Sequence, residues 1–222
     1  MSNSDRVVLV LGGAGLVGSG IVKALLDKGF KVSVISRDSS RLERLQSFVS
    51  PTTKANLTTI VGNVGSEEGA EQAKQDLLKA VGKVTDIVSS LGFSWWQGGP
   101  PHTQSLKDLH WVVETLLYST FVSWKCFFPL VRDDSNCTYT FITGDSFNPV
   151  LLLTARFHAQ FQLCMKIDTG VATLERMVPG YLNHLDLGET VATLVERRNS
   201  SHAVFYVNCP ADLKTILLER NP

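Results

Sequence analysis

The 222-residue sequence has few cysteines, no excess of charge of either sign and no long hydrophobic segment. Its four cysteines are widely separated and form no Cys-x-x-Cys motif, so we expect neither a metal site nor a disulfide framework. Lysine and arginine together number 21, as do aspartate and glutamate, so the chain has no overall field that would attract nucleic acid or an acidic membrane. Neither is an expected partner.

The first apolar segment, Val7 to Leu11, is too short for the hydrophobic region of a signal peptide or for a membrane span. This favours a cytoplasmic protein. Hydrophobic residues make up 44% of the chain and charged residues 19%, which is an ordinary globular composition. Because no repeat, low-complexity tract or linker marks a boundary, we expect residues 1–222 to form a single domain.

Segments typical of strands and of helices alternate along the chain. Val7 to Leu11 is a continuous run of β-branched residues and leucine, as in a strand that is buried on both faces. A glycine cluster, a helical apolar pattern (Ile21 to Leu26) and a second strand (Lys31 to Ser36) follow, which together make a βαβ unit. This alternation predicts an α/β fold, a Rossmann-type doubly wound parallel sheet flanked by helices. Further strands are expected at 57–61, 85–91, 138–143, 169–177 and 203–208, and further helices at 41–49, 70–81, 106–128, 150–165 and 189–197.

The glycine cluster lies between the first strand and the first helix. Gly12 permits a tight turn, Gly15 lets backbone N–H groups approach a pyrophosphate, and Gly18 allows the helix to pack close to the sheet. The start of the helix adds unpaired donors and a dipole that favours an anion. The cluster therefore predicts a dinucleotide-binding site formed by Gly12, Ala14, Gly15, Leu16, Val17 and Gly18.

The end of the second strand indicates which dinucleotide is bound. An acidic residue there would bind the ribose hydroxyls of NAD, whereas an arginine accommodates the 2′-phosphate of NADP. The sequence has Ser36-Arg37-Asp38, with Arg41 one helical turn further on, and a hydroxyl beside a guanidinium suits a phosphate. We therefore favour NADP(H) over NAD(H), bound through Ser36 and Arg37. The alternative is that Arg37 is a solvated charge and that Asp38 binds the ribose.

These features resemble the short-chain dehydrogenase/reductase family. The glycines are spaced Gly-x-x-Gly-x-x-Gly, as in extended and atypical members. Asn63-Val64 stands where the family has Asp-Val beside the adenine, Ser90-Leu91-Gly92 where it has Asn-Ala-Gly, and Pro179-Gly180 where it has Pro-Gly near the nicotinamide. The resemblance covers nearly the whole chain. It implies a single NAD(P)-binding Rossmann domain that acts on a small-molecule substrate.

The catalytic residues that the resemblance implies are largely missing. The family uses a serine after the fifth strand and a Tyr-x-x-x-Lys motif in the next helix, where the tyrosine exchanges a proton with the substrate oxygen. Here Thr143 or Ser146 would supply the hydroxyl, but the predicted helix 150–165 has no tyrosine. Neither Arg156 nor His158, placed at the lysine position, brings a tyrosine into register. The asparagine that the family has in the preceding helix is also absent.

Two routes to proton transfer stay open. In the first, Tyr118, His158, Arg156 or Tyr181 enters the active site, although arginine can only polarise an oxygen because it does not release its proton. In the second, water or the substrate supplies the proton. Each side chain also has a structural interpretation, His158 as a packed helix residue and Tyr118 as a core or interface aromatic.

Two functions are consistent with this sequence. One is an NADP(H)-dependent oxidoreductase for a small carbonyl-type compound, and the other is a catalytically silent NADP(H)-binding regulator, sensor or scaffold. The loop Phe93 to Gln97 contains two tryptophans and suits either the wall of a substrate pocket or a partner-binding surface. The helices that begin near Ser105 and Val150 are apolar over more than one face, which favours a homodimer, although helices in the core of a monomer would look the same.

Overall fold

The computed structural model describes residues 2–92, 101–144, 162–167, 169, 171–198 and 203–218. Within these residues, seven parallel strands form one sheet in the order β3-β2-β1-β4-β5-β6-β9. Two further strands form a separate short parallel pair. The strands are β1 (Val7–Leu11), β2 (Lys31–Ser36), β3 (Leu57–Val61), β4 (Asp86–Ser89), β5 (Thr138–Gly144), β6 (Gln162–Ile167), β7 (Val171–Ala172), β8 (Leu182–Asn183) and β9 (Val204–Val207).

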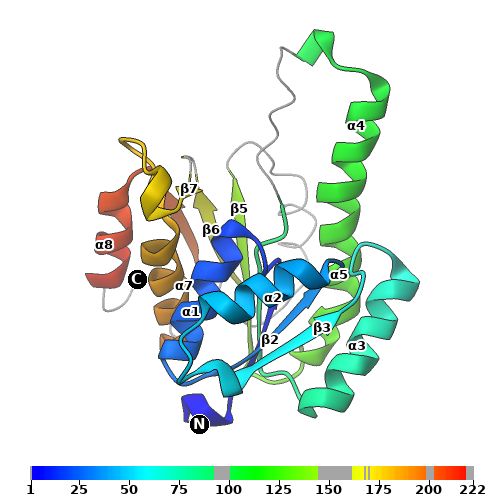
Figure 1. Cartoon of the computed structure of the whole chain (residues 1–222), viewed down its shortest axis with the longest axis vertical. Helices are drawn as coiled ribbons and strands as arrows, with labels where there is room; N and C mark the ends of the chain where they lie inside the picture. The colour runs from blue at the N-terminus through cyan, green and yellow to red at the C-terminus, as the bar shows by residue number, and fades with distance from the viewer. Residues whose placement is uncertain are drawn as a thin grey trace.

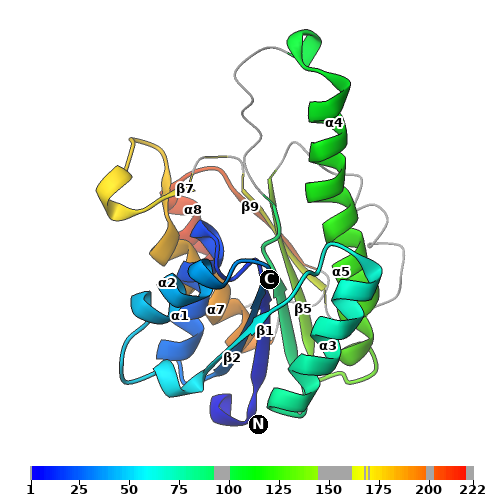
Figure 2. The same cartoon turned by 45° about the vertical axis from the view of Figure 1, so that its right-hand side comes forward.

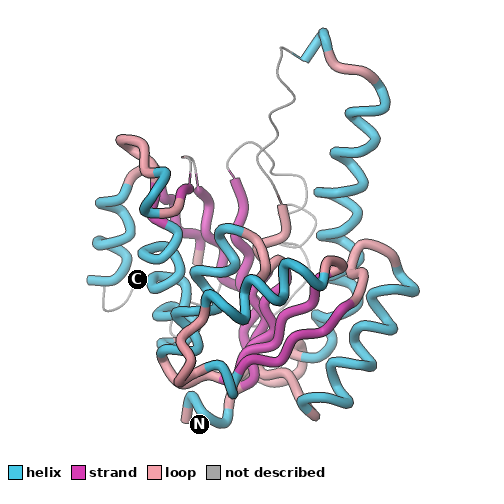
Figure 3. The backbone as a smooth tube through the Cα atoms, viewed as in Figure 1, coloured by secondary structure: helices cyan, strands magenta, loops and turns pink. Residues whose placement is uncertain are grey.

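Helices cover both faces of the seven-stranded sheet (Figure 1). The helices are α1 (Leu16–Asp27), α2 (Ser39–Phe48), α3 (Glu67–Val81), α4 (Leu106–Val112), α5 (Ser119–Phe127), α7 (His184–Arg197) and α8 (Pro210–Leu218). In Figure 2, α1, α2 and α7 lie on one side of the strands, and α3 and α5 lie on the other. The three layers, coloured by secondary structure in Figure 3, confirm the predicted doubly wound α/β fold.

Strand β1 lies inside the sheet, between β2 and β4, and supplies both hydrophobic cores. Its five residues are all buried, as the continuous apolar run predicts for a strand covered on both faces. Val8 and Val10 pack into the core shared with α1, α2 and α7, while Leu9 and Leu11 pack into the core shared with α3 and α5. Because β1 pairs with β2 on one side and β4 on the other, the strand order reverses at its carboxyl end, where ligands bind in such sheets.

The predicted long helix is present but changes its winding in the middle. Ser105 and Asp108 form the expected capping box, in which each side chain bonds the backbone N–H of the other residue. Between α4 and α5, Val113–Tyr118 is π-helical, and the run ends in a 3-10 turn, Phe128–Leu130, that contains Pro129. Figure 1 shows α4 extending well beyond the ends of the strands.

The second half of the chain departs from two sequence-based expectations. Residues 162–165 were expected to end a helix but belong to β6, which pairs with β5 and β9. The expected strand 169–177 is wrong, because only Val171–Ala172 is strand and Leu174–Arg176 forms a 3-10 turn. At 162–165 a short apolar run fits a buried strand as well as a helix, and periodicity does not separate them. Helix α8 was not predicted at all.

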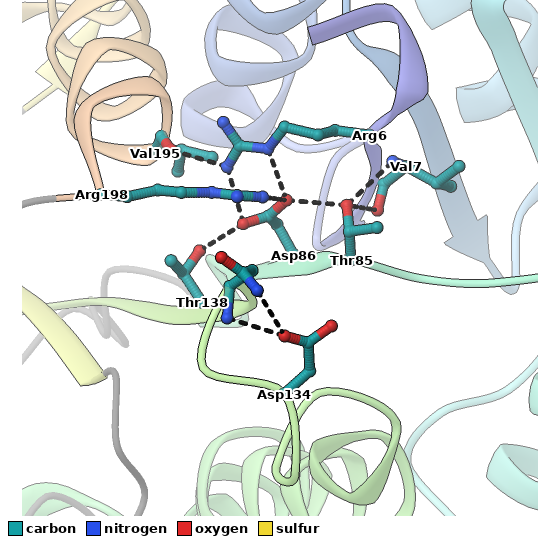
Figure 4. Close-up of polar contacts among 9 residues, drawn as sticks. Arg6, Val7, Thr85, Asp86, Asp134, Thr138, Val195 and Arg198 are labelled. Carbon is teal, nitrogen blue, oxygen red and sulfur yellow. Dashed lines mark hydrogen bonds and ion pairs between the residues drawn. The ribbon is translucent and has the colours of Figure 1, made fainter. Parts of the chain in front are cut away.

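A buried polar cluster joins the amino ends of the central strands (Figure 4). Arg6 binds both carboxylate oxygens of Asp86, with Nε 3.0 Å from one and a terminal nitrogen 2.8 Å from the other. The hydroxyls of Thr85 and Thr138 each donate to Asp86 at 2.8 Å, and Arg6 also donates to the carbonyl of Val195 in α7 at 2.7 Å. Arg6 and Asp86 are 2% and 0% exposed, so this cluster fixes β1, β4, β5 and α7 to one another away from solvent.

Candidate cofactor site and active-site residues

The glycine turn after β1 has a geometry that other residues would not adopt. Gly12 has a φ of +79°, and a Cβ added to it would lie 2.5 Å from the carbonyl oxygen of Ser90. A Cβ on Gly18 would lie 2.1 Å from the carbonyl oxygen of Gly12. The turn is therefore folded tightly against both the end of β4 and the first turn of α1, as the spacing of the glycines predicts.

The start of α1 is left open toward solvent. Gly15 precedes the helix in an extended conformation, no side chain caps its first turn, and that turn has no acidic residue. Ala14 and Val17 are half-buried against the core, and Leu16 is exposed at the rim. The backbone N–H groups and the helix dipole at this point suit an anion, so these residues fit the pyrophosphate of a dinucleotide.

The two charged residues that follow β2, Arg37 and Asp38, make different contacts. The Arg37 side chain is exposed and forms no hydrogen bond or ion pair within the described part of the chain. Asp38 instead caps α2, accepting from the Ser40 N–H at 2.9 Å and from the Ser40 hydroxyl at 2.7 Å. The Ser40 hydroxyl thereby lowers the pKa of Asp38. The oxygen of Ser36 accepts from the Asp38 N–H at 3.2 Å, which leaves its hydroxyl proton free to donate.

The capping role of Asp38 is absent from the sequence-based expectation. Helix α2 begins at Ser39, whereas the expected helix began at residue 41. An aspartate directly before a helical pattern is a recognised start signal and would have identified both the earlier boundary and the role of this carboxylate.

Asn63 and Val64 form the turn that follows β3. The side-chain oxygen Oδ1 of Asn63 accepts from the Gly65 N–H at 3.0 Å, and the side-chain nitrogen Nδ2 donates to the Ser66 hydroxyl at 3.3 Å. The carbonyl of Val64 accepts from Ser123 of α5 at 3.1 Å, which ties this turn to the helix layer. The pair lies next to the end of β2, because β3 and β2 are neighbours in the sheet.

Ser90, Leu91 and Gly92 follow β4 and touch the glycine turn. The Ser90 N–H donates to the carbonyl of Leu11 at 2.9 Å, and its buried hydroxyl oxygen has no partner within the described residues. Leu91 is half-buried against the core, and Gly92 has a φ of +151°. Leu116 of the π-helical segment lies 3.6 Å from where a Gly92 Cβ would be. These contacts bring the ends of β1 and β4 and the long helix together.

Pro179 and Gly180 do not stand where the sequence placed them. They were expected directly after the sixth strand, but β6 ends at Ile167 and they follow the 3-10 turn Leu174–Arg176. The misplacement has the same origin as the missed strand, since the sequence predicts helix at 162–165, where the structure has β6. The Thr169 hydroxyl donates to the carbonyl of Gly180 at 2.9 Å, so Pro179 and Gly180 fold back beside the residues that follow β6.

The candidate catalytic residues are only partly covered by the structure. Thr143 is half-buried near the carboxyl end of β5, the edge at which the glycine turn lies. Ser146, Arg156 and His158 lie outside the described residues, as do the two tryptophans of the loop before α4. Tyr118 is 55% exposed at the end of the π-helical segment, two residues beyond the leucine that faces Gly92.

The chain has four tyrosines, and none lies between β5 and β6. Tyr139 is 1% exposed in β5, and burial raises its pKa far above that of a free tyrosine, so it is unsuited to proton exchange. Tyr181 and Tyr206 are partly exposed, the first after Gly180 and the second on the edge strand β9.

Within the described residues, no three His, Cys, Asp or Glu side chains are grouped so that they could hold a metal ion. No helix in that part of the chain is both long enough and apolar enough to cross a bilayer.

Comparison with solved structures finds the same fold in proteins of distant sequence. A mutant of a Serratia marcescens short-chain dehydrogenase/reductase superposes with a TM-score of 0.73 at 16% identity, covering 96% of this chain and 100% of that one. A blue fluorescent protein from a metagenomic library, in complex with NADPH, gives 0.73 at 16% identity over 95% and 100% of the two chains. YwfH, an NADPH-dependent reductase involved in bacilysin biosynthesis, gives 0.71 at 12% identity over 91% and 98%.

The family model for short chain dehydrogenases matches residues 6–143. The match begins at the start of β1 and ends in β5, and it includes the glycine turn and the ends of β2, β3 and β4. It stops before the segment in which the family has its Tyr-x-x-x-Lys motif. Because the match spans more than half of the sequence and the fold agrees throughout, the chain belongs to the short-chain dehydrogenase/reductase family.

Proposed function

We propose that this protein is an NADP(H)-dependent oxidoreductase that acts on a small carbonyl-type compound without the usual tyrosine. The observation that carries the cofactor choice is the division of roles after β2. Arg37 is exposed with no partner in the described chain, while Asp38 is bonded into the first turn of α2. A cationic side chain is thus available to a 2′-phosphate, and the nearby carboxylate is already engaged.

The remaining cofactor contacts are assigned to three loops at the carboxyl edge of the sheet. The turn from Gly12 to Gly18 would hold the pyrophosphate against the first N–H groups of α1. Asn63-Val64 would flank the adenine, and Ser90 to Gly92 would lie along the nucleotide beside the glycine turn. When bound, NADP(H) supplies the hydride chemistry, and the role of the protein is to hold and orient it.

The proton that accompanies hydride transfer must come from a group other than the family tyrosine. Thr143, near the end of β5, would bond a substrate oxygen, but a hydroxyl of this kind orients the oxygen and is a poor acid. We propose that water or the substrate itself supplies the proton, or that His158 does so. Arg156 and Ser146 would polarise or orient the substrate. Tyr118 is the weakest candidate, since its side chain is largely solvent-exposed.

We also propose that residues 1–222 form one domain and that two copies form a homodimer. The long helix carries five exposed large apolar side chains, which a second copy would cover. They are Leu106, Leu109, Trp111, Tyr118 and Phe121. The expected cytoplasmic location stays a prediction.

A second candidate function is a catalytically silent NADP(H)-binding regulator. The observation that favours it is that no tyrosine occurs between β5 and β6, so the family's proton donor is absent while the cofactor turn is intact. In this case cofactor binding would change the conformation or partner of the protein, and no substrate would be turned over.

One experiment separates these functions. The protein is mixed with NADPH or NADH, and binding is followed by calorimetry and by thermal stabilisation. The same samples then receive a panel of aldehydes, ketones and enones, and NADPH oxidation is followed at its absorbance band. NADPH binding with turnover of any member supports the oxidoreductase. NADPH binding with no turnover supports the regulator, and absence of binding contradicts both.

A further inference from the structure

We infer that Asp38 serves the 2′-phosphate site by capping α2, through its hydrogen bonds and not its charge, and that it is not an acceptor for the ribose hydroxyls. This inference rests on the proposed binding of NADP(H), and it concerns how the end of β2 selects the cofactor. The residue type alone points the other way, because an acidic residue after this strand ordinarily indicates NAD. The contacts of Asp38 decide between the two interpretations.

The carboxylate of Asp38 is turned toward its own helix. One oxygen, Oδ1, accepts from the Ser40 N–H at 2.9 Å, the Ser40 hydroxyl at 2.7 Å and the Arg41 N–H at 3.4 Å. These are the donors that an N-cap satisfies, and no other side chain caps α2. An oxygen with three donors has little capacity left for a pair of ribose hydroxyls.

The second oxygen of Asp38 lies near Arg41, which is a second candidate ligand for the phosphate. Oδ2 lies 3.6 Å from Nε of Arg41, and both side chains are about half exposed. An ion pair with this exposure is weak, so it does not hold the guanidinium in place. Arg41 lies near the end of β2 because it belongs to the first turn of α2, and its terminal nitrogens are able to join Arg37 and the Ser36 hydroxyl around a phosphate.

This arrangement makes a specific prediction about charge. If Asp38 only caps α2, its negative charge opposes a dianionic phosphate bound close by, and the charge itself is dispensable. Asparagine caps a helix as well as aspartate does but carries no charge. Asp38→Asn should therefore keep the helix start while removing the repulsion, and Asp38→Ala should remove the cap as well.

The test compares the affinities of NADPH and NADH by calorimetry for the wild type and three variants. For Asp38→Asn we expect NADPH to bind about two- to five-fold more tightly and NADH to stay within about two-fold, since screened repulsion from one charge is modest. Asp38→Ala should lower the melting temperature by about 3 °C, the usual effect of a lost cap in a chain of this size, and Asp38→Asn should not. Glu43→Gln removes the same charge from the same helix without touching the cap, and it should change neither affinity by more than about two-fold.

The affinities and melting temperatures that would overturn the inference differ clearly from the expected ones. If Asp38 binds the ribose, Asp38→Asn loses a charged hydrogen bond and weakens NADH at least about ten-fold, which overturns the inference. Equal melting temperatures for Asp38→Ala and Asp38→Asn overturn the capping role. If the wild type binds neither dinucleotide, the proposed function fails instead, and the melting temperatures still report on the cap.

Discussion

The two edges of the sheet differ in whether their charged groups are buried and paired. At the amino edge, Arg6 and Asp86 are almost fully buried, and each oxygen of Asp86 accepts two hydrogen bonds. At the carboxyl edge, the start of α1 has no cap and Arg37 has no partner within the described residues. One edge is closed by its own side chains, and the other leaves donors open. An edge with open donors is the one able to receive an anionic ligand.

Helix α7 spans the distance between these edges. It begins at His184, next to Gly20 of α1, and near its end the carbonyl of Val195 accepts from Arg6. The residue that follows α7, Arg198, has a left-handed backbone conformation. One of its terminal nitrogens lies 3.6 Å from a carboxylate oxygen of Asp86. If the two edges are as different as their contacts indicate, substitutions at one should affect stability and substitutions at the other should affect binding.

The largest effect is expected at the amino edge. Asp86→Asn leaves the buried guanidinium of Arg6 without a countercharge, and breaking a buried pair in this way costs about 3–5 kcal/mol of the free energy of unfolding. Urea unfolding would measure this loss. The affinity for NADPH of the folded fraction should be unchanged, because the cluster lies at the amino ends of the strands and the glycine turn follows the carboxyl end of β1.

An exposed pair of similar geometry provides the control. Arg132 binds both oxygens of Asp133 at 2.8 Å, as Arg6 binds Asp86, but both side chains are more than half exposed. Asp133→Asn should leave the unfolding midpoint unchanged. Equal losses for Asp86→Asn and Asp133→Asn would show that burial of the amino-edge cluster does not matter.

The next largest effect is expected at the glycine turn. Gly12 and Gly29 have nearly equal φ angles, +79° and +84°, but only Gly12 faces another backbone, that of Ser90. Alanine at either position should cost about 1–2 kcal/mol through the left-handed backbone. Only Gly12→Ala should also weaken NADPH binding, by more than about a hundred-fold, because the turn must open to admit the Cβ. Calorimetry on both variants would check this, and equal NADPH affinities would contradict the assignment of the turn.

Arg37 gives a smaller and more selective effect. Arg37→Ala should weaken NADPH by about ten- to a hundred-fold, the usual contribution of a charge-assisted contact, and leave NADH within about two-fold. Arg44→Ala, which removes an exposed cation from the adjoining helix α2, is the matched control. A drop in NADH affinity equal to that in NADPH affinity would mean that Arg37 supports the helix and does not bind the 2′-phosphate.

The first half of the fold was predictable because each element carries its own local signal. β1, β2 and β3 have the predicted bounds, and the glycines between β1 and α1 have the tight geometry that their spacing requires. The Asp86 cluster was not predictable, because it joins Arg6 to residues up to Arg198 that are adjacent only after folding. Pair contacts at such separations leave no pattern in a single sequence.

The second half was harder to predict for a different reason. After β5 the sequence is apolar over a long stretch, so strand β6 could not be distinguished from the end of a helix. Because of that error, Pro179 and Gly180 were expected directly after the sixth strand, whereas they follow the 3-10 turn Leu174–Arg176. The role of Asp38 was missed although its signal was present, since an acidic residue after β2 has both a ligand interpretation and a capping interpretation. Only its hydrogen bonds separate these.

The smallest expected effect concerns His184, where α7 begins near the carboxyl edge. Its ring is buried beside Phe48 and its Nδ1 has no partner within the described residues. Burial lowers the pKa of His184, and a hydrogen bond with the Ala172 backbone and the nearby Asp186 offset this only in part. The unfolded histidine takes up its proton near pH 6.5, while the folded one does so only at lower pH. The free energy of unfolding should therefore fall as the pH drops below about 6.5, by at most about 1.4 kcal/mol per pH unit for this one proton.

His184→Gln keeps a neutral polar side chain and should flatten that part of the pH profile measured by urea unfolding, whereas Asp86→Asn should shift the whole profile downward without changing its slope there. An unchanged slope in His184→Gln would mean that this ring is protonated as readily in the folded chain as in the unfolded one.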